Sequence, residues 1–122
     1  MCSGTSPKGP NQLKQPNNDI GIVIYRIHPD GNQLDAVWYS TLLDQKAMGT
    51  GIAIGDTTHG FAGEYAISYL SYDGRDAGTC NLKIVKTDNI YDVFWITNDT
   101  VTSRGVGIET ADGLAVGWRE VT

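Results

Sequence analysis

The chain has 122 residues, of which 40% are hydrophobic, and its formal net charge is -5. This length fits one domain with a single core, and this hydrophobic content excludes wholesale disorder. Phosphate binding needs a basic face, so the acidic balance and the scattered Lys and Arg residues exclude a nucleic-acid-binding module. The apolar runs are far shorter than the roughly 18 residues that a membrane-spanning helix requires.

Residues 1–18 are polar, rich in Pro, Asn and Gln, and without periodicity. Such a segment buries too little surface to order itself, so we expect a flexible polar tether. The single β-rich domain then covers residues 19–122. Two cysteines, Cys2 and Cys80, are too few and too far apart to predict a zinc site.

The start of the chain, Met-Cys-Ser-Gly followed by a polar spacer, resembles the mature start of a bacterial lipoprotein. This resemblance implies a signal peptide cut before Cys2, a lipid on Cys2, and a location that is exported, periplasmic or anchored to the outer membrane. Two alternatives stay open. The protein is cytoplasmic and its second residue happens to be Cys, or Cys2 forms a disulfide with Cys80 in an oxidising compartment.

Eight β-like runs follow the tether, separated by turn residues such as Asp-Gly and Asn-Asp. They cover residues 20–28, 34–41, 48–55, 64–72, 79–87, 90–97, 102–110 and 114–121. No run carries a sustained helical stripe of apolar residues. Short strands at this spacing predict an all-β fold, an eight-stranded antiparallel up-and-down barrel, with a flattened sandwich as the alternative.

The second half of the chain repeats the first. Leu34-Asp35-Ala36-Val37-Trp38 returns as Tyr91-Asp92-Val93-Phe94-Trp95, and Gly49-Thr50-Gly51-Ile52 returns as Gly105-Val106-Gly107-Ile108. We interpret residues 20–65 and 77–121 as two four-strand pseudo-repeats that share one core.

Glycines at alternate positions predict sharp bends with aromatic rings lying over them. A turn at Asp112-Gly113 would place Gly107 across from Trp118. A turn at Asp99-Thr100 would place Gly105 across from Phe94. The same device in both halves favours closure of the sheet.

This outline resembles the calycin group, the lipocalins and avidins, in strand number, length and order. The segment Gly107-Ile108 with Leu114-Ala115-Val116-Gly117-Trp118 is also similar to a pattern in secreted bacterial proteins. The first strand has Tyr25 where lipocalins open with Gly-x-Trp. The resemblance therefore implies the architecture and no bound lipid or biotin.

Four aromatic residues are candidate ligand contacts: Trp38, Trp95, Trp118 and Tyr65. In a barrel mouth, such rings form a stacking platform for a sugar, a flat ring or a peptide. The other interpretation is that they fill the core of a small β protein. We favour the filled core, because Trp38 and Trp95 occupy equivalent repeat positions.

Polar candidates are sparse, and we predict no catalytic residue, metal or cofactor. His59 with Asp56 or Glu64 could form a general base or half a metal site, but a solvated loop histidine is the favoured interpretation. Asp35 and Asp92 are repeat-equivalent, which invites a glycosidase-like acid and base, although solvent-facing positions explain them more simply. If the core is filled, an interaction patch on the loops would contain Asp44, Asp56 and His59.

These observations favour a non-enzymatic binding or interaction module of the bacterial cell envelope, for example an inhibitor or partner-binding lipoprotein. Its partner would be a protein or a small molecule, with no nucleic acid, and with the membrane reached through a lipid on Cys2. One alternative is a small hydrolase or isomerase with a site at the barrel mouth. Another is a structural subunit of a surface assembly that pairs through an exposed strand edge.

Overall fold

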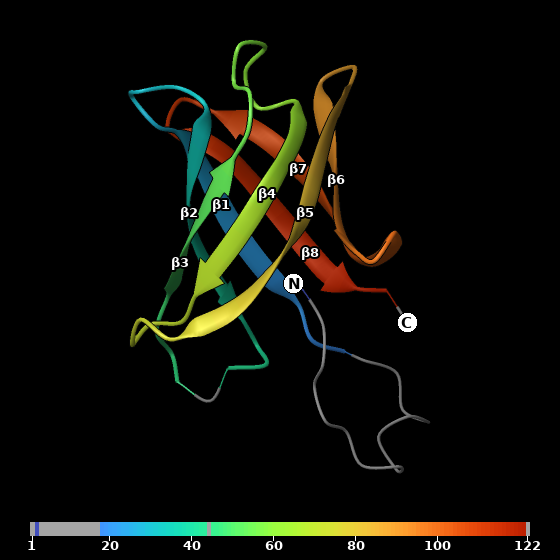
Figure 1. Cartoon of the computed structure of the whole chain (residues 1–122). Helices are drawn as coiled ribbons and strands as arrows, with labels where there is room; N and C mark the ends of the chain where they lie inside the picture. The colour runs from blue at the N-terminus through green and yellow to red at the C-terminus, as the bar shows by residue number, and fades with distance from the viewer. Residues whose placement is uncertain (1, 3–17, 44, 122) are drawn as a thin grey trace.

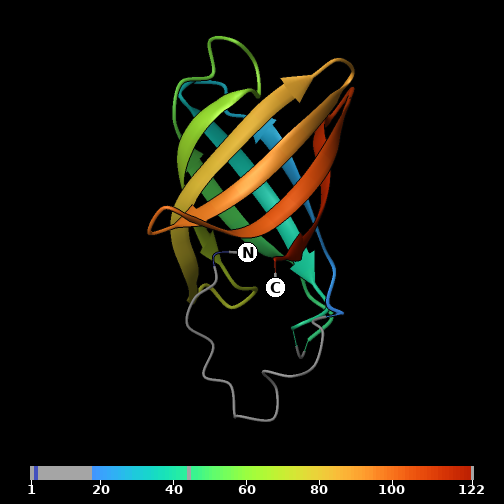
Figure 2. The ribbon, with the colours of Figure 1, turned by 90° about the vertical axis from the view of Figure 1, so that its right-hand side faces the viewer.

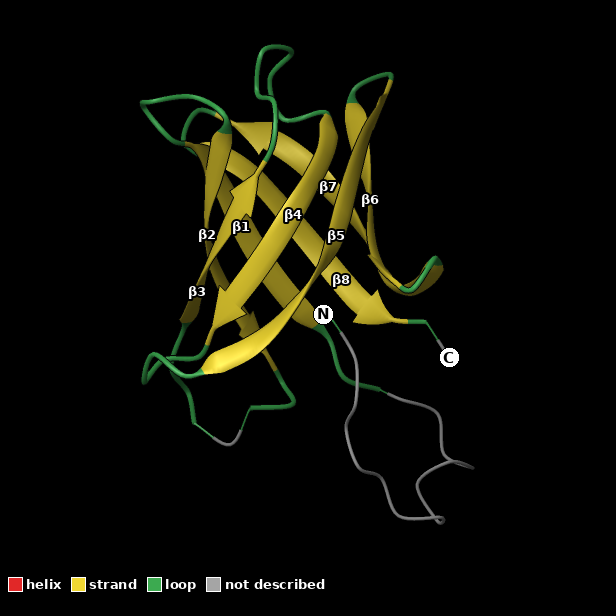
Figure 3. Ribbon diagram, viewed as in Figure 1, coloured by secondary structure: helices red, strands yellow, loops and turns green. Residues whose placement is uncertain are grey.

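The computed structural model describes Cys2 and residues 18–43 and 45–121. The chain forms an all-β barrel in which each strand pairs antiparallel with the next and β8 pairs with β1 to close the sheet (Figures 1 and 3). Among the described residues, no helix has the length and apolar character needed to cross a membrane. The strands are β1 (Gly21–Ile27), β2 (Gln33–Ser40), β3 (Gly49–Ile54), β4 (Gly63–Leu70), β5 (Asp76–Thr87), β6 (Ile90–Thr97), β7 (Thr100–Thr110) and β8 (Gly113–Glu120).

The predicted eight-stranded barrel is confirmed, and each predicted strand bound lies within three residues of the observed one. Closure excludes the flattened sandwich. Every described strand has hydrogen-bonded neighbours on both sides, so the described strands offer no free edge of the kind that the alternative of a structural subunit invoked. Closed barrels remove strand edges altogether, which protects a small β protein from edge-to-edge association.

Two predicted hairpin registers are wrong. The β6–β7 turn is Asn98-Asp99, whose φ angles of 51° and 64° match a two-residue turn with both central residues left-handed. The β7–β8 turn uses Ala111-Asp112, because Thr110 pairs with Gly113. Asn and Asp tolerate the left-handed region well, which moves the β6–β7 turn one residue earlier than expected.

These shifts change which residues face each other. Arg104 pairs with Phe94, and Gly105 pairs with Trp118. Gly107 pairs with Val116, and a Cβ at Gly107 would meet the Val116 and Leu114 side chains, with no ring among its nearest contacts. The predicted ring over Gly107 is therefore wrong.

Rings do lie over glycines elsewhere in the barrel. A Cβ at Gly21 would fall 2.0 Å from the Trp118 ring, and one at Gly49 would fall 2.6 Å from the Trp38 ring. Each of these glycines is the direct cross-strand partner of the ring that covers it. In the first half a ring therefore covers Gly49, a glycine predicted to serve this purpose, whereas in the rest of the barrel the covered glycine is Gly21 and not Gly107. The absence of a side chain lets each indole lie against the neighbouring backbone.

The interior is filled with side chains. Inward residues alternate with outward ones along every strand, and the largest fully buried inward side chains include Trp95, Tyr25, Tyr69, Leu34, Ile67 and Leu82. At the centre, Trp95 Nε1 donates to Tyr69 Oη at 2.8 Å, and Tyr25 Oη lies 2.6 Å from Tyr69 Oη. Burial raises the pKa of both tyrosines well above the ordinary value.

Side chains also close the barrel at both ends. At the end with the β3–β4 loop, upper in Figure 1, Phe61 is 5% exposed and Tyr65 Oη donates to the Phe61 carbonyl at 3.0 Å. At the opposite end, Cys2 is bonded to Cys80 of β5 and packs against the core. Figure 2 shows the barrel from another side, with β5, β6 and β7 facing the viewer.

The two halves pair with different registers. Leu34 faces Ala53 in the first half, whereas its repeat counterpart Tyr91 faces Gly107 in the second. If the repeat were exact, residue 109, the counterpart of Ala53, would face Tyr91. The strand register of the second half is therefore shifted by two residues relative to the first. The pseudo-repeat, and the superposition of Trp38 on Trp95 that it implies, stay predictions.

Candidate functional site

The four aromatic candidates all belong to the core. Trp95 is 0% exposed, and Trp38, Trp118 and Tyr65 are between 3% and 7% exposed. Trp38 Nε1 donates to the carbonyls of Thr50 and Leu70, so its polar edge is occupied by backbone. These contacts favour the filled-core interpretation and leave no role for the rings as an open stacking platform.

Two of the polar loop candidates, Asp56 and His59, share one loop, where hydrogen bonds from Thr58 lower the pKa of Asp56 and the charge of His59 lowers it further. Asp56 and His59 are exposed on the β3–β4 loop, where Asp56 accepts hydrogen bonds from the backbone and hydroxyl of Thr58. Asp44 lies outside the described residues, and its loop joins β2 to β3 at the other end of the barrel. Within the described chain, no group of three or more His, Cys, Asp or Glu residues could hold a metal ion.

The two repeat-equivalent aspartates also lie apart. Asp35 is on β2 and Asp92 is on β6, which are four strands apart around an eight-stranded barrel. Asp92 lies 3.9 Å from Arg104, and Asp35 bonds to His28. Carboxylates on opposite sides of a filled barrel cannot flank one glycosidic bond, so they do not form an acid and base pair.

One side of the barrel exterior is apolar. We define the apolar face as the outward side chains of Ile22, Ile24, Val37, Ile52, Ile54, Val106 and Ile108, which are between 39% and 63% exposed. They lie on β1, β2, β3 and β7, joined through the small outward residues Ala115 and Gly117 of β8. An exposed apolar surface that runs over five neighbouring strands is typical of an interaction site.

The opposite side of the same barrel is largely polar, with outward residues that include Glu64, Ser68, Thr79, Asn81 and Lys83 on β4 and β5. Strand formation therefore does not require apolar residues on the outside of this barrel. The β-propensity of Val and Ile alone does not account for their concentration on one side.

A groove of about 490 Å³ crosses the apolar face over β7, β8 and the start of β1. Its lining includes Ile20, Arg104, Val106, Gly117, Trp118 and Arg119. Gly117 is exposed at its floor, and its direct neighbours on the two adjacent strands are Val106 and Ile22. The groove thus combines apolar walls with two guanidinium groups, because Arg104 pairs with Arg119 across β7 and β8.

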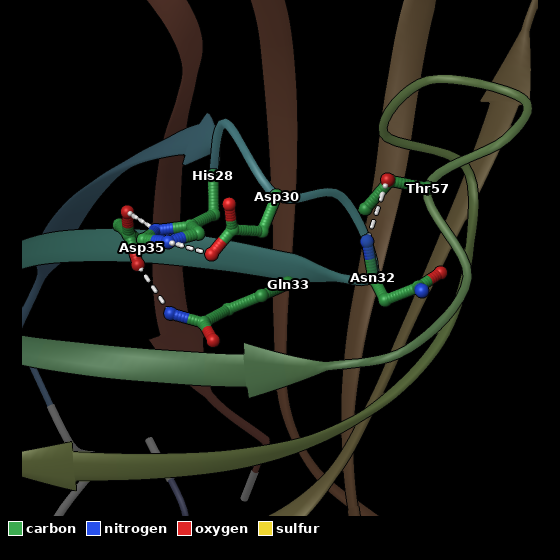
Figure 4. A network of polar contacts seen from close by, with 6 residues as sticks. All are labelled: His28, Asp30, Asn32, Gln33, Asp35 and Thr57. Carbon is green, nitrogen blue, oxygen red and sulfur yellow. Dashed lines mark hydrogen bonds and ion pairs between the residues drawn. The ribbon is translucent and has the colours of Figure 1, made fainter.

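A polar network holds the β1–β2 hairpin at the upper end (Figure 4). His28 Nδ1 lies 2.9 Å from Asp35 Oδ2, and His28 Nε2 lies 3.4 Å from Asp30 Oδ2. Gln33 Nε2 donates to the other oxygen of Asp35 at 2.7 Å. The hairpin register brings these groups together, because the His28 backbone amide donates to the Gln33 carbonyl.

The electrostatics of this network favour a protonated imidazole. The hydrogen bond with Asp35 raises the pKa of His28, and the charges of Asp35 and Asp30 raise it further. Hydrogen bonds from His28 and Gln33 lower the pKa of Asp35. With a carboxylate at each ring nitrogen, the protonated His28 has no free site for proton transfer to a substrate, so the network holds the hairpin rather than performing catalysis.

Comparison of the chain with protein-family models, with curated proteins and with solved structures found no match. The fold itself defines the class: a closed eight-stranded up-and-down β-barrel with a filled interior.

The apolar face was missed by the sequence analysis, although the sequence carries a signal for it. The run Ile20-Gly21-Ile22-Val23-Ile24-Tyr25 is apolar at both inward and outward positions. A strand with one solvated face normally alternates apolar with polar residues, so a continuous run indicates that both faces are covered. In a barrel with a filled interior, such a run predicts an outer wall that is apolar as well.

Proposed function

We propose that the chain is a non-enzymatic binding module of the bacterial cell envelope that engages a partner through the apolar face. The observation that carries this proposal is the one-sided exposure of large aliphatic side chains on a barrel whose interior is already filled. Covering the exposed half of one such side chain contributes roughly 1 kcal/mol, so several together supply a useful binding energy.

The filled interior supports an exterior site. In hollow barrels of this size, a small ligand occupies the space that Trp95, Tyr69 and Tyr25 occupy here. The upper mouth, where a hydrolase site would lie, is covered by Phe61 and Tyr65. Binding on the outer wall requires no rearrangement of these side chains.

The disulfide supports the envelope part of the proposal. Cys2 and Cys80 are joined, and disulfides persist in oxidising compartments such as the periplasm. A sulfur in a disulfide cannot also carry a thioether-linked lipid, so the disulfide and the lipid on Cys2 are alternative states of the same residue. Mass spectrometry of the protein from its native host distinguishes them.

The proposal is tested with an envelope extract of the organism that encodes the chain. The immobilised wild-type protein is compared with Ile24→Glu, which places a charge in the apolar face, and with Thr79→Glu, which places the same charge on the polar side. We expect Ile24→Glu to lose the captured partner and Thr79→Glu to retain it. Equal capture by all three proteins would show that the apolar face is not the binding surface.

A further inference from the structure

We propose that the apolar face is covered by a second copy of the same chain, in a two-fold symmetric dimer in which Arg26 of each copy meets Asp35 of the other. This inference rests on the proposed function and names the partner. Three features carry it: the extent of the apolar face, a hollow beside the outward row of β1, and one charge of each sign at that hollow.

The apolar face is large enough for a stable dimer. A standard protein–protein interface takes about 800 Å² from each partner, and this is about a tenth of the 7693 Å² surface of this chain. Two convex walls meet mainly along the central strands of the face, β8, β1 and β2, which are three of the eight strands of the wall. This part of the face alone therefore provides the area that a dimer needs, and two sheets pack face to face when their outward aliphatic side chains interdigitate.

The relief of the face suits a contact with itself. β1, which carries Ile22 and Ile24, lies between two hollows: the groove over β7 and β8, and a second hollow of about 310 Å³ over β1 and β2. Ile24 and Val37, which are direct cross-strand partners, form the aliphatic part of the second hollow. A row of side chains beside a hollow is complementary to itself, because a two-fold rotation at the edge of the hollow brings the row of each copy to the hollow of the other.

The second hollow also carries one charge of each sign. Arg26 and Asp35 line it and are direct cross-strand partners, yet within the described chain no ion pair joins them. Arg26 Nε donates to the Asp112 carbonyl at 3.1 Å. Asp35 is held by His28 and Gln33 (Figure 4). Since a guanidinium has five N–H donors and a carboxylate about four acceptor sites, each group retains the capacity for a further bond.

A second copy supplies the complement of this hollow. A partner surface of one charge sign would repel either Arg26 or Asp35, whereas a two-fold rotation brings the guanidinium of each copy to the carboxylate of the other. This reciprocity belongs to every two-fold contact, in which residue i meets residue j and residue j meets residue i. The formal net charge of -5 on each chain repels the other copy at long range, and physiological salt screens that repulsion beyond about 8 Å. The two ion pairs then fix the register of the aliphatic contact.

Sedimentation velocity of the full-length chain in physiological salt, from about 1 to about 100 µM, measures the dimer directly. We expect wild type to dimerise, and Thr79→Glu, the matched control on the polar side, to form the same dimer. Ile24→Glu should remain monomeric, because it places a charge in the centre of the contact. Circular dichroism and the Tm of each variant check that the barrel is intact.

The reciprocal ion pairs have a test of their own. Arg26→Glu and Asp35→Arg should each dimerise at least tenfold more weakly than wild type, because each change brings like charges together in both contacts. An equimolar mixture of the two variants should form a heterodimer of wild-type strength, since both contacts then join opposite charges again. Mixing would not repair a local structural defect in either variant.

The remaining outcomes contradict the inference in distinguishable ways. If wild type stays monomeric over this range, the second copy is excluded, and loss of the captured envelope partner on Ile24→Glu would leave the proposed function standing. A dimer that Ile24→Glu leaves intact would overturn the inference and also count against the apolar face. A dimer that both charge variants leave intact, or that mixing them does not restore, would overturn the pairing of Arg26 with Asp35.

Discussion

The hydroxyl oxygens of Tyr25 and Tyr69 lie 2.6 Å apart at the centre of the barrel, joining β1 to β4 across the filled interior. Trp95 Nε1 extends this connection by donating to Tyr69 Oη at 2.8 Å. Tyr69 is thus the shared partner of two buried polar groups. Because a buried group without a hydrogen bond is costly, this small network selects one arrangement of the three rings.

Tyr69→Phe should destabilise the barrel more than Tyr25→Phe. The first change leaves both Trp95 Nε1 and Tyr25 Oη unpaired, whereas the second leaves the Trp95 bond to Tyr69 intact. Each buried group left unpaired costs on the order of 1–3 kcal/mol. Urea unfolding of the two variants measures the difference, and equal midpoints would contradict the account of Tyr69 as the shared partner.

The contribution of His28 to stability should depend on pH. Its raised pKa means that the stabilisation is complete below the ordinary histidine value and is lost as the pH rises through the folded-state pKa. The lowered pKa of Asp35 means that its contribution to stability is lost as the pH falls from the ordinary aspartate value through the folded-state pKa. The pair therefore contributes most between about pH 4 and pH 6.5.

Thermal unfolding of wild type and His28→Gln checks this prediction. We expect the difference in Tm to be largest near pH 5.5 and to shrink toward pH 8.5. In an Asp35→Asn background, the same histidine substitution should lose much of its pH dependence. A difference that stays constant across this range would show that the hydrogen bond does not depend on the charge of His28.

Gly21→Ala and Gly117→Ala form a matched pair with opposite expectations. The added methyl at Gly21 would lie 2.0 Å from the Trp118 ring, so that ring must move, at a cost of roughly 1–3 kcal/mol. The methyl at Gly117 meets open space and restricts the unfolded chain, so we expect no loss and a gain of up to about 1 kcal/mol. Chemical denaturation compares the two, and a destabilised Gly117→Ala would mean that the fold itself requires that glycine.

Reduction of the disulfide should lower stability substantially. Cys2 and Cys80 are 78 residues apart in sequence, and closing a loop of this length stabilises a fold by roughly 2–4 kcal/mol. A reductant should shift the unfolding midpoint of wild type to that of Cys2→Ser, and should leave the Cys2→Ser midpoint unchanged. If the reductant leaves the unfolding midpoint of wild type unchanged, the two cysteines are not joined in solution.

The fold was predictable because the signals for it are local. Turn residues mark each hairpin, and the short β-like runs between them identify strands, so eight antiparallel strands and their order follow from the sequence. The exact pairing was not predictable in the same way. Whether a turn is Asp99-Thr100 or Asn98-Asp99 depends on which residues adopt positive φ, and several residues there tolerate it.

The candidate site was predicted less well, because it depends on pairing between strands distant in the sequence. Ile22 and Val106 are 84 positions apart and meet only through Gly117, once β8 has closed the barrel between β7 and β1. The partnership of His28 with Asp35 likewise depends on the hairpin register. A one-residue change in register would have moved every outward side chain of a strand to the interior.

In a barrel with a filled interior, inward and outward side chains have different roles. Inward side chains such as Trp95 and Tyr69 determine whether the chain folds, and outward ones such as Ile22 and Val106 determine what the folded chain meets. In a hollow barrel the ligand pocket and the core are the same residues, so a new specificity is gained at the risk of the fold. Here the outward side chains can change in sequence while the packing beneath them is inherited unchanged.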